Sequence, residues 1–227
     1  MEKTILLHIE TATSVCGAAI SVDGETVALA EIDQANVHAE RLTLLIDEAL
    51  QQAGFTYKNL AAVSVSAGPG SYTGLRIGTS TAKGLCFALD IPLIDVRTLD
   101  AMAAGMQKRG EAENVDFFCP ILDARRMEVY AAVYRGAEKL EAEHPEIISE
   151  NSFAGWLEKG KVLFFGSGAA KCEPLLGAHE HAFFTPDFSC SAADQPALAY
   201  HKFLAGDFAD LAYFEPFYLK EFFTGKH

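Results

Sequence analysis

The feature that most constrains the fold is an order of elements that occurs twice along the 227 residues. A strand-like run over 4–9 leads to Glu10, and after a short polar gap a hairpin follows, with an Asp-Gly pair at its turn. A second strand over 116–125 contains Asp123 at its acidic end and is again followed by a hairpin, over 128–143. Each half then alternates strand and helix. The sequence therefore predicts an α/β protein whose mixed sheets carry helices on both faces.

This order is that of the actin/Hsp70/sugar-kinase (ASKHA) class, which is built from two ribonuclease-H-like lobes. We place an N-terminal lobe at 1–105 and a smaller C-terminal lobe at 106–227, and we allow the last segment to pack back on the N-terminal lobe. Periodicity and turn residues predict the remaining elements. These are helices over 38–53, 72–89, 98–110, around 151–160 and over 196–204, and strands over 61–67, 91–96 and 161–165.

Composition narrows the possible classes of protein. Half of the residues are apolar and 22% are charged, as in an ordinary globular domain. No apolar run reaches the ~18 residues of a membrane helix, and the N-terminus does not resemble a signal peptide, so we expect a cytoplasmic protein. Five scattered cysteines without a CxxC pair argue against a disulfide framework or a zinc site. The net charge of −13 argues against direct, tight nucleic-acid binding and suits either a basic protein partner or a solvated acidic surface.

The glycine-rich stretch 66–78, SAGPGSYTGLRIG, raises the question of phosphate binding. A Walker A loop needs GxxxxGK[ST], but the nearby Lys83 precedes its glycine. Gly68, Gly70 and Gly74 form GxGxxxG, one residue longer than the dinucleotide fingerprint. Neither nucleotide template is matched.

Two interpretations of this stretch stay open. Backbone amides could hold an anion at the start of the following helix, with Ser71 or Thr73 as the N-cap. Alternatively, the glycines serve turns and close packing, and Gly74 and Gly78 form a smooth stripe for a neighbouring helix.

Carboxylates at strand ends hold Mg²⁺ and orient water in the kinases and ATPases of this class. Those enzymes commonly have DxG at the first position, where this chain has Glu10-Thr11-Ala12, so ATP hydrolysis is not expected. The charged turn over 123–128 could line a cleft or form an arginine–carboxylate network. The candidate vestigial cleft residues are Glu10, Thr11, Gly68, Gly70, Ser71, Asp123, Arg125 and Glu128.

Other catalytic patterns are missing from the sequence. His179 and His181 would share one face of a strand, but no third metal ligand is visible, so we predict no metal site. Neither GxSxG nor HExxH occurs, and no catalytic residue is assigned.

Four segments, IETAT, SAGPGSYTGLRIGTSTAKGL, LDARRMEVYAA and EPFYL, occur in an order and spacing that closely resemble the bacterial TsaB (YeaZ) family. The resemblance is strong over the first two-thirds of the chain and thins beyond about residue 135. Glu10 stands where an aspartate is common in the family.

The resemblance implies a two-lobed actin-like fold without an active nucleotide site or a cofactor. The paralogous catalytic subunit TsaD transfers threonylcarbamoyl to an adenosine of tRNA, giving N6-threonylcarbamoyladenosine (t6A). TsaD binds metal through HxxxH, and these two positions fall on Thr98 and Met102 here, which do not suit that metal site. The resemblance thus implies a noncatalytic subunit.

The resemblance also implies partners. The chain would bind TsaD through helices of the N-terminal lobe, the ATPase TsaE would join, isolated chains would form homodimers through much the same surface, and tRNA would be reached only through the complex. The expected interface residues are His38, Leu42, Leu45, Ile46, Tyr72, Thr73, Gly74, Leu75, Gly78 and Ala82. The alternative is an independent ATPase, kinase or peptidase-like enzyme of the same fold.

Overall fold

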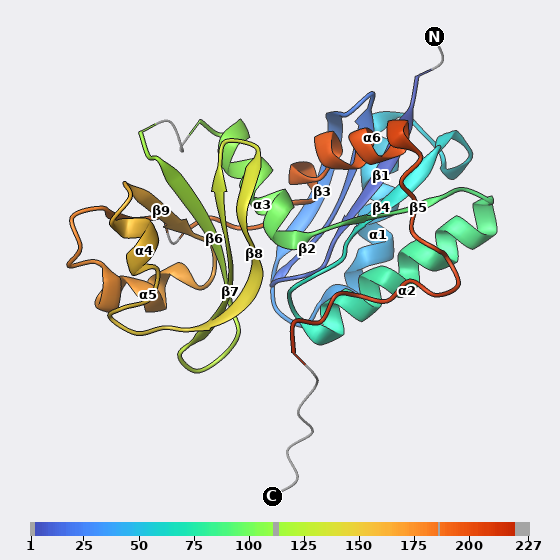
Figure 1. Ribbon diagram of the computed structural model, residues 1–227. Helices are drawn as coiled ribbons and strands as arrows, with labels where there is room; N and C mark the ends of the chain where they lie inside the picture. Colours follow the sequence, from blue (N-terminus) through green and yellow to red (C-terminus); the bar gives the residue numbers. More distant parts are fainter. Residues whose placement is uncertain (1–2, 111–113, 186, 221–227) are drawn as a thin grey trace, which may run out of the picture. The chain divides into compact units, whose positions relative to one another are not determined.

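A computed structural model describes residues 3–110, 114–185 and 187–220 (Figure 1). The chain divides into two compact units. The first consists of Met1–Gly110 and Ser189–Pro216, and the second of Glu111–Phe188 and Phe217–His227. The first unit thus extends slightly beyond residue 105, and a later part of the chain returns to it.

The elements follow the predicted alternation closely. The strands are β1 (Ile5–Glu10), β2 (Val15–Val22), β3 (Glu25–Asp33), β4 (Ala62–Ser66), β5 (Leu93–Val96), β6 (Phe117–Asp123), β7 (Glu128–Arg135), β8 (Glu138–Ile147), β9 (Val162–Phe165) and β10 (Ala182–Thr185). The α-helices are α1 (His38–Ala53), α2 (Tyr72–Leu89), α3 (Thr98–Lys108), α4 (Ala154–Leu157), α5 (Ala169–Leu176) and α6 (Pro196–Ala205). Two 3-10 helices are η1 (Tyr57–Asn59) and η2 (Ala192–Asp194).

The two sheets have the same topology, which confirms the duplicated order. The first sheet is ordered β3-β2-β1-β4-β5, and the second, read from its other edge, β8-β7-β6-β9-β10. In each sheet the first strand in sequence pairs antiparallel with the hairpin strand beside it and parallel with the strand that follows the hairpin. The α/β class with two ribonuclease-H-like halves is therefore confirmed.

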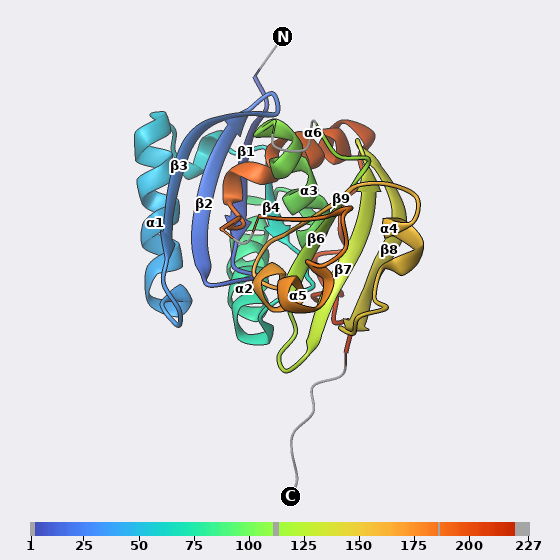
Figure 2. The same cartoon turned by 90° about the vertical axis from the view of Figure 1, so that its left-hand side faces the viewer.

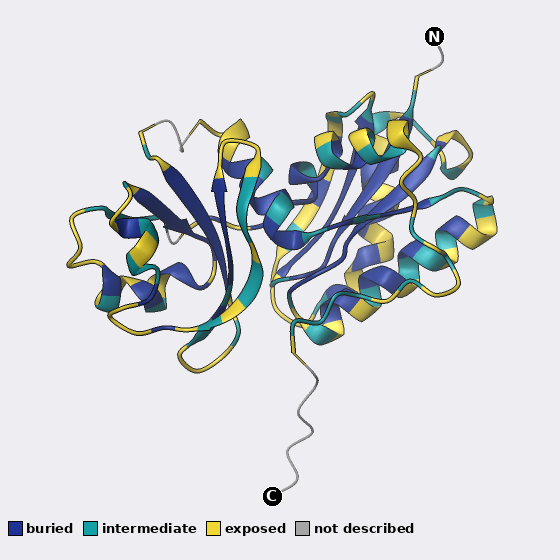
Figure 3. Ribbon diagram, in the orientation of Figure 1, coloured by how far each residue is buried: buried dark blue, intermediate teal, exposed yellow. Residues whose placement is uncertain are grey.

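The central strand β1 is buried on both faces of the first sheet, since its consecutive residues point to opposite sides and all six are buried. Ile5, Leu7 and Ile9 pack in the cluster that contains the buried residues of α1, while Leu6 packs in the cluster that contains Ala199 of α6. Figures 1 and 2 show α1 and α2 on one face of this sheet and α6 on the other. In Figure 3 its central strands are almost entirely coloured as buried. The returning segment thus completes the first unit.

The second unit has a core rich in aromatic side chains. Phe117 lies edge-on to Trp156, with ring centroids 5.1 Å apart, and Phe164 stacks on Phe184 at 5.3 Å. The sequence analysis missed α5 and β10. Helix α5 begins after a Gly-Ser-Gly run and carries Pro174, and β10 has only four residues, so neither gives a long periodic signal.

All five cysteines are buried and unpaired. Within the described ranges, no helix is both long and apolar enough to cross a membrane.

Candidate functional site

The acid at the end of β1 is closed in by its own unit. Glu10 is only 1% exposed. One carboxylate oxygen accepts the Ala12 N–H at 2.7 Å, and the other accepts the hydroxyl of Ser66. Burial raises the pKa of Glu10, and these hydrogen bonds oppose the shift. Both carboxylate oxygens are therefore engaged inside the unit.

Glu10 ends a row of buried polar groups on three neighbouring strands. On β1, His8 is paired with Ser64 of β4, and Ser21 of β2 lies on its other side. The Ser21 hydroxyl donates to His8 Nε2 at 2.7 Å, His8 Nδ1 lies 2.7 Å from Ser64 Oγ, and Ser64 donates to Gln195 Oε1 at 2.8 Å. Because Ser64 donates its hydroxyl hydrogen to Gln195, it can only accept from His8, so His8 donates from Nδ1. The Nε2 of the neutral ring then carries no hydrogen and accepts from Ser21.

The row continues through Gln195 in the returning segment. Its amide donates to the Ile9 carbonyl at 2.9 Å and to Ser66 Oγ at 3.0 Å. Ser66 then donates to Glu10, so every hydrogen bond from Ser21 onward is directed toward the carboxylate. Burial lowers the pKa of His8 to about 3, so its ring is neutral at physiological pH.

The glycine loop closes on the turn that follows Glu10. A Cβ at Gly70 would lie 2.4 Å from the Ala12 carbonyl oxygen, and one at Gly74 would lie 2.1 Å from the Thr11 carbonyl oxygen. Ser71 donates its N–H to the Ala12 carbonyl at 2.7 Å. The turn after Glu10 therefore packs directly against the glycine loop and the start of α2, with no room for a side chain at Gly70 or Gly74.

Of the two N-cap candidates, the structure selects Ser71, whose hydroxyl accepts the Gly74 N–H at 3.2 Å. The expectation that Gly74 and Gly78 form a stripe for a neighbouring helix is wrong, because both face Thr11 of the same unit. A Cβ at Gly78 would lie 2.2 Å from Thr11 Oγ1. Gly84, further along α2, has nothing within 4 Å of such a Cβ.

Most residues expected at a partner interface lie inside the first unit. The buried ones are His38, Leu42, Leu45, Ile46, Gly74, Leu75, Gly78 and Ala82, while Tyr72 is half-buried and Thr73 is exposed. They form the inner faces of α1 and α2. The outer faces expose apolar residues that the sequence analysis did not select, among them Leu44 at 54% and Phe87 at 83%.

Asp123, the equivalent of Glu10 in the second unit, keeps the same local geometry but stays exposed. Its carboxylate accepts the N–H of Arg125, two residues on, at 2.6 Å, as Glu10 does from Ala12. It also accepts the Lys171 ammonium at 2.5 Å. Glu128 accepts from Lys220. The turn is thus fixed by lysine side chains and a backbone N–H, and among the described residues the foreseen arginine–carboxylate network does not form.

The two TsaD histidine positions are occupied by buried side chains here. Thr98 is fully buried and Met102 is 1% exposed. The placement of His179 and His181 on a strand is wrong, since both precede β10 in a turn. His181 Nδ1 lies 2.8 Å from the Leu157 carbonyl, which fixes it structurally. Within the described residues, no group of three metal-ligating side chains occurs.

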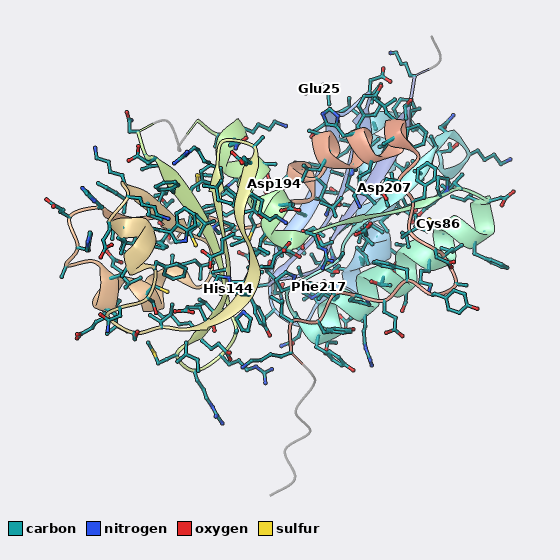
Figure 4. All side chains as sticks on the ribbon, in the orientation of Figure 1. Glu25, Cys86, His144, Asp194, Asp207 and Phe217 are labelled. Carbon is teal, nitrogen blue, oxygen red and sulfur yellow. The ribbon has the colours of Figure 1, made fainter. Side chains whose placement is uncertain are left out.

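Sequence reasoning missed Asp194, a buried acid in η2 that lies beside α3 (Figure 4). Its carboxylate accepts the Ser191 N–H at 3.1 Å and pairs with Arg109 at 3.4 Å. A Cβ at Gly105 would lie 2.4 Å from this carboxyl group, so α3 packs directly on it. Burial raises the pKa of Asp194 from 3.8 to about 7, against the effect of Arg109. No local motif in the sequence marks this residue.

Fold and site together define an actin-like α/β protein whose glycine loop is packed by its own chain. Two solved structures share the fold. One is an uncharacterized protein with similarity to peptidase YeaZ from Pseudomonas aeruginosa, with a TM-score of 0.82 and 24% identity over 97% of this chain and all of that one. The other is the ROK hexokinase from Thermus thermophilus, with a TM-score of 0.52 and 11% identity over 88% of this chain and all of that one.

Sequence comparison gives the family. A family model described as TsaD, tRNA N6-adenosine threonylcarbamoyltransferase, matches residues 32–213. The tRNA threonylcarbamoyladenosine biosynthesis protein TsaB of Bacillus subtilis is 31% identical over 71% of this chain and 70% of its own length. That of Haemophilus influenzae is 37% identical over 57% of this chain. The chain therefore belongs to this family and, within it, to the TsaB (YeaZ) proteins. The match spans 53% of the Haemophilus relative, about half of its length.

The two glycines of α2 give a matched test of this packing. We expect Gly78→Ala to lower the free energy of unfolding by about 1–3 kcal/mol, because the added methyl group overlaps Thr11. Gly84→Ala should raise it by about 1 kcal/mol through helix propensity alone. Urea unfolding monitored by circular dichroism measures both. Equal changes in the free energy of unfolding for the two variants would show that Thr11 does not lie against Gly78.

Asp194 predicts a specific pH dependence. Its folded pKa of about 7 exceeds the ordinary 3.8, so stability from this group is present at low pH and is lost as the pH rises toward 7. The unfolding free energy of the wild type minus that of Asp194→Asn should therefore fall between pH 5 and pH 8, by at most about 1.4 kcal/mol per unit. Urea titrations across this range test it, and a difference that rises with pH would contradict it.

Proposed function

We propose that this chain is a noncatalytic subunit of the machinery that forms t6A in tRNA, and that it holds a TsaD-type catalytic subunit in a productive shape. The observation that carries the proposal is the packing of Thr11 and Ala12 against the glycine loop, which argues against a phosphate site there. The names of the TsaB relatives supply the pathway. The protein would act in the cytoplasm.

The outer faces of α1 and α2 are the proposed partner surface. Along α2, Thr73, Ile77, Ser80, Gly84 and Ala88 follow one another at spacings of three and four residues and are exposed or half-buried. Residues at these spacings share one side of a helix, and small ones allow another helix to approach closely. These outward-facing residues replace most of the interface residues expected from the sequence, which lie on the buried inner faces of α1 and α2.

Three further partner roles belong to the same proposal. A TsaE-type ATPase joins the complex once the catalytic subunit is bound. Isolated chains form a two-fold dimer through the α1–α2 surface, as a self-complementary patch permits. The complex as a whole receives the tRNA.

Reconstitution tests the function directly. The reaction contains a TsaD-type subunit, a TsaE-type ATPase, ATP and a threonylcarbamoyl donor. We expect t6A formation to fall at least about tenfold when this chain is left out, because the TsaD-type subunit is then no longer held in its productive shape. Mass spectrometry of digested tRNA measures the modified nucleoside. Undiminished t6A without the chain contradicts the proposal, as does turnover of Mg-ATP by the isolated chain in a calorimeter.

A charged side chain at Gly84 tests the surface. We expect Gly84→Arg to abolish co-purification with the TsaD-type subunit, because a long cation would enter a close helix contact. Gly155→Arg is the matched control, since Gly155 is also a helical glycine with open space around it but lies in α4 of the second unit. Both variants should unfold at wild-type temperatures. Normal co-purification of Gly84→Arg would exclude this face.

A further inference from the structure

The turn between β6 and β7 has an unusual backbone. Arg125 and Arg126 are consecutive and both left-handed, with φ of 73° and 49°. Residues other than glycine rarely adopt this backbone conformation, and two such residues in succession persist only where the surrounding structure holds them. Both arginines are exposed, and Figure 3 shows the turn coloured mainly as exposed.

Several hydrogen bonds fix this turn. The Asp123 carboxylate accepts the Arg125 N–H at 2.6 Å. The Lys171 ammonium, which comes from α5, donates to the carbonyls of Arg126 at 2.9 Å and Glu128 at 2.8 Å. The backbone that carries the two guanidinium groups is therefore held in one conformation before any ligand binds.

The charges of the turn are unbalanced. Lys171 pairs with Asp123 and Lys220 pairs with Glu128, so both carboxylates are already neutralised. Among the described residues, no hydrogen bond or ion pair uses the guanidinium of Arg125 or Arg126. The turn over 123–128, together with Lys171 and Lys220, thus carries an excess of two positive charges on a chain whose net charge is −13.

We propose that Arg125 and Arg126 bind the phosphate backbone of tRNA within the assembled complex. A guanidinium presents a planar fork of N–H donors that matches phosphate oxygens, and two adjacent forks can bind successive phosphates. The acidic remainder of the chain repels RNA, which confines the contact to this turn. The inference rests on the proposed function, since that function makes tRNA the substrate, but it adds a direct contact from this subunit.

The test compares charge-matched double variants. Arg125→Gln with Arg126→Gln removes the two free charges, while Arg135→Gln with Lys159→Gln removes two charges elsewhere in the second unit. Each is assembled with the TsaD-type and TsaE-type subunits, and binding of unmodified tRNA is measured by fluorescence anisotropy from low to moderate salt. We expect only the first variant to bind about tenfold more weakly near 0.1 M salt, with a slope of log K against log salt shallower by about 1 to 2.

The outcomes separate this inference from the proposed function. Equal tRNA affinity and equal slope for the two double variants would overturn the phosphate contact, while the wild-type requirement for t6A would still stand. Loss of complex assembly by the Arg125/Arg126 variant, with unchanged melting temperature, would assign the turn to an acidic protein partner and also overturn it. Weaker tRNA binding by an intact complex with a shallower slope supports it.

Discussion

The hydrogen-bonded row from Ser21 to Glu10 is the interaction on which the first unit depends. It places polar side chains from three adjacent strands in a region without water access, where each unpaired group would cost about 1–3 kcal/mol. Gln195 closes the row, since its amide both accepts from Ser64 and donates to Ser66. The returning segment Ser189–Pro216 is therefore part of the first unit, because its Gln195 satisfies the buried polar groups of the sheet.

The same row determines how the Glu10 carboxylate is oriented at this edge of the sheet. A carboxylate that serves Mg²⁺ or water must present its oxygens outward, whereas Glu10 directs both toward its own unit. Once Glu10 is held inward, the next residues, Thr11 and Ala12, lie under the glycine loop and fill it. Asp123 has the same local turn but remains exposed, and its oxygen is taken by Lys171.

The sequence predicts those parts of the structure that depend on local signals. The helix over 38–53 has the predicted bounds because apolar spacing and a following Gly54 are local properties, and the repeated strand order follows from hairpin turns and alternation. The link between Gln195 and Ile9 spans 186 positions and leaves no periodic trace. Spacing likewise placed Gly74 and Gly78 on one stripe, but it could not say that Thr11, rather than another helix, lies against it.

Helix α2 therefore uses glycine for two opposite reasons. Gly74 and Gly78 are required by the fold, because any side chain would overlap the turn after Glu10. Gly84 meets no such neighbour, yet glycine in a helix interior costs about 1 kcal/mol relative to alanine. In the part of the first unit that the structure describes, no atom lies within 4 Å of a Cβ at Gly84 to offset that cost by packing. A close approach by another molecule would offset it, and this is the physical reason for placing the partner on the outer face of α2 rather than on the stripe that the sequence first suggested.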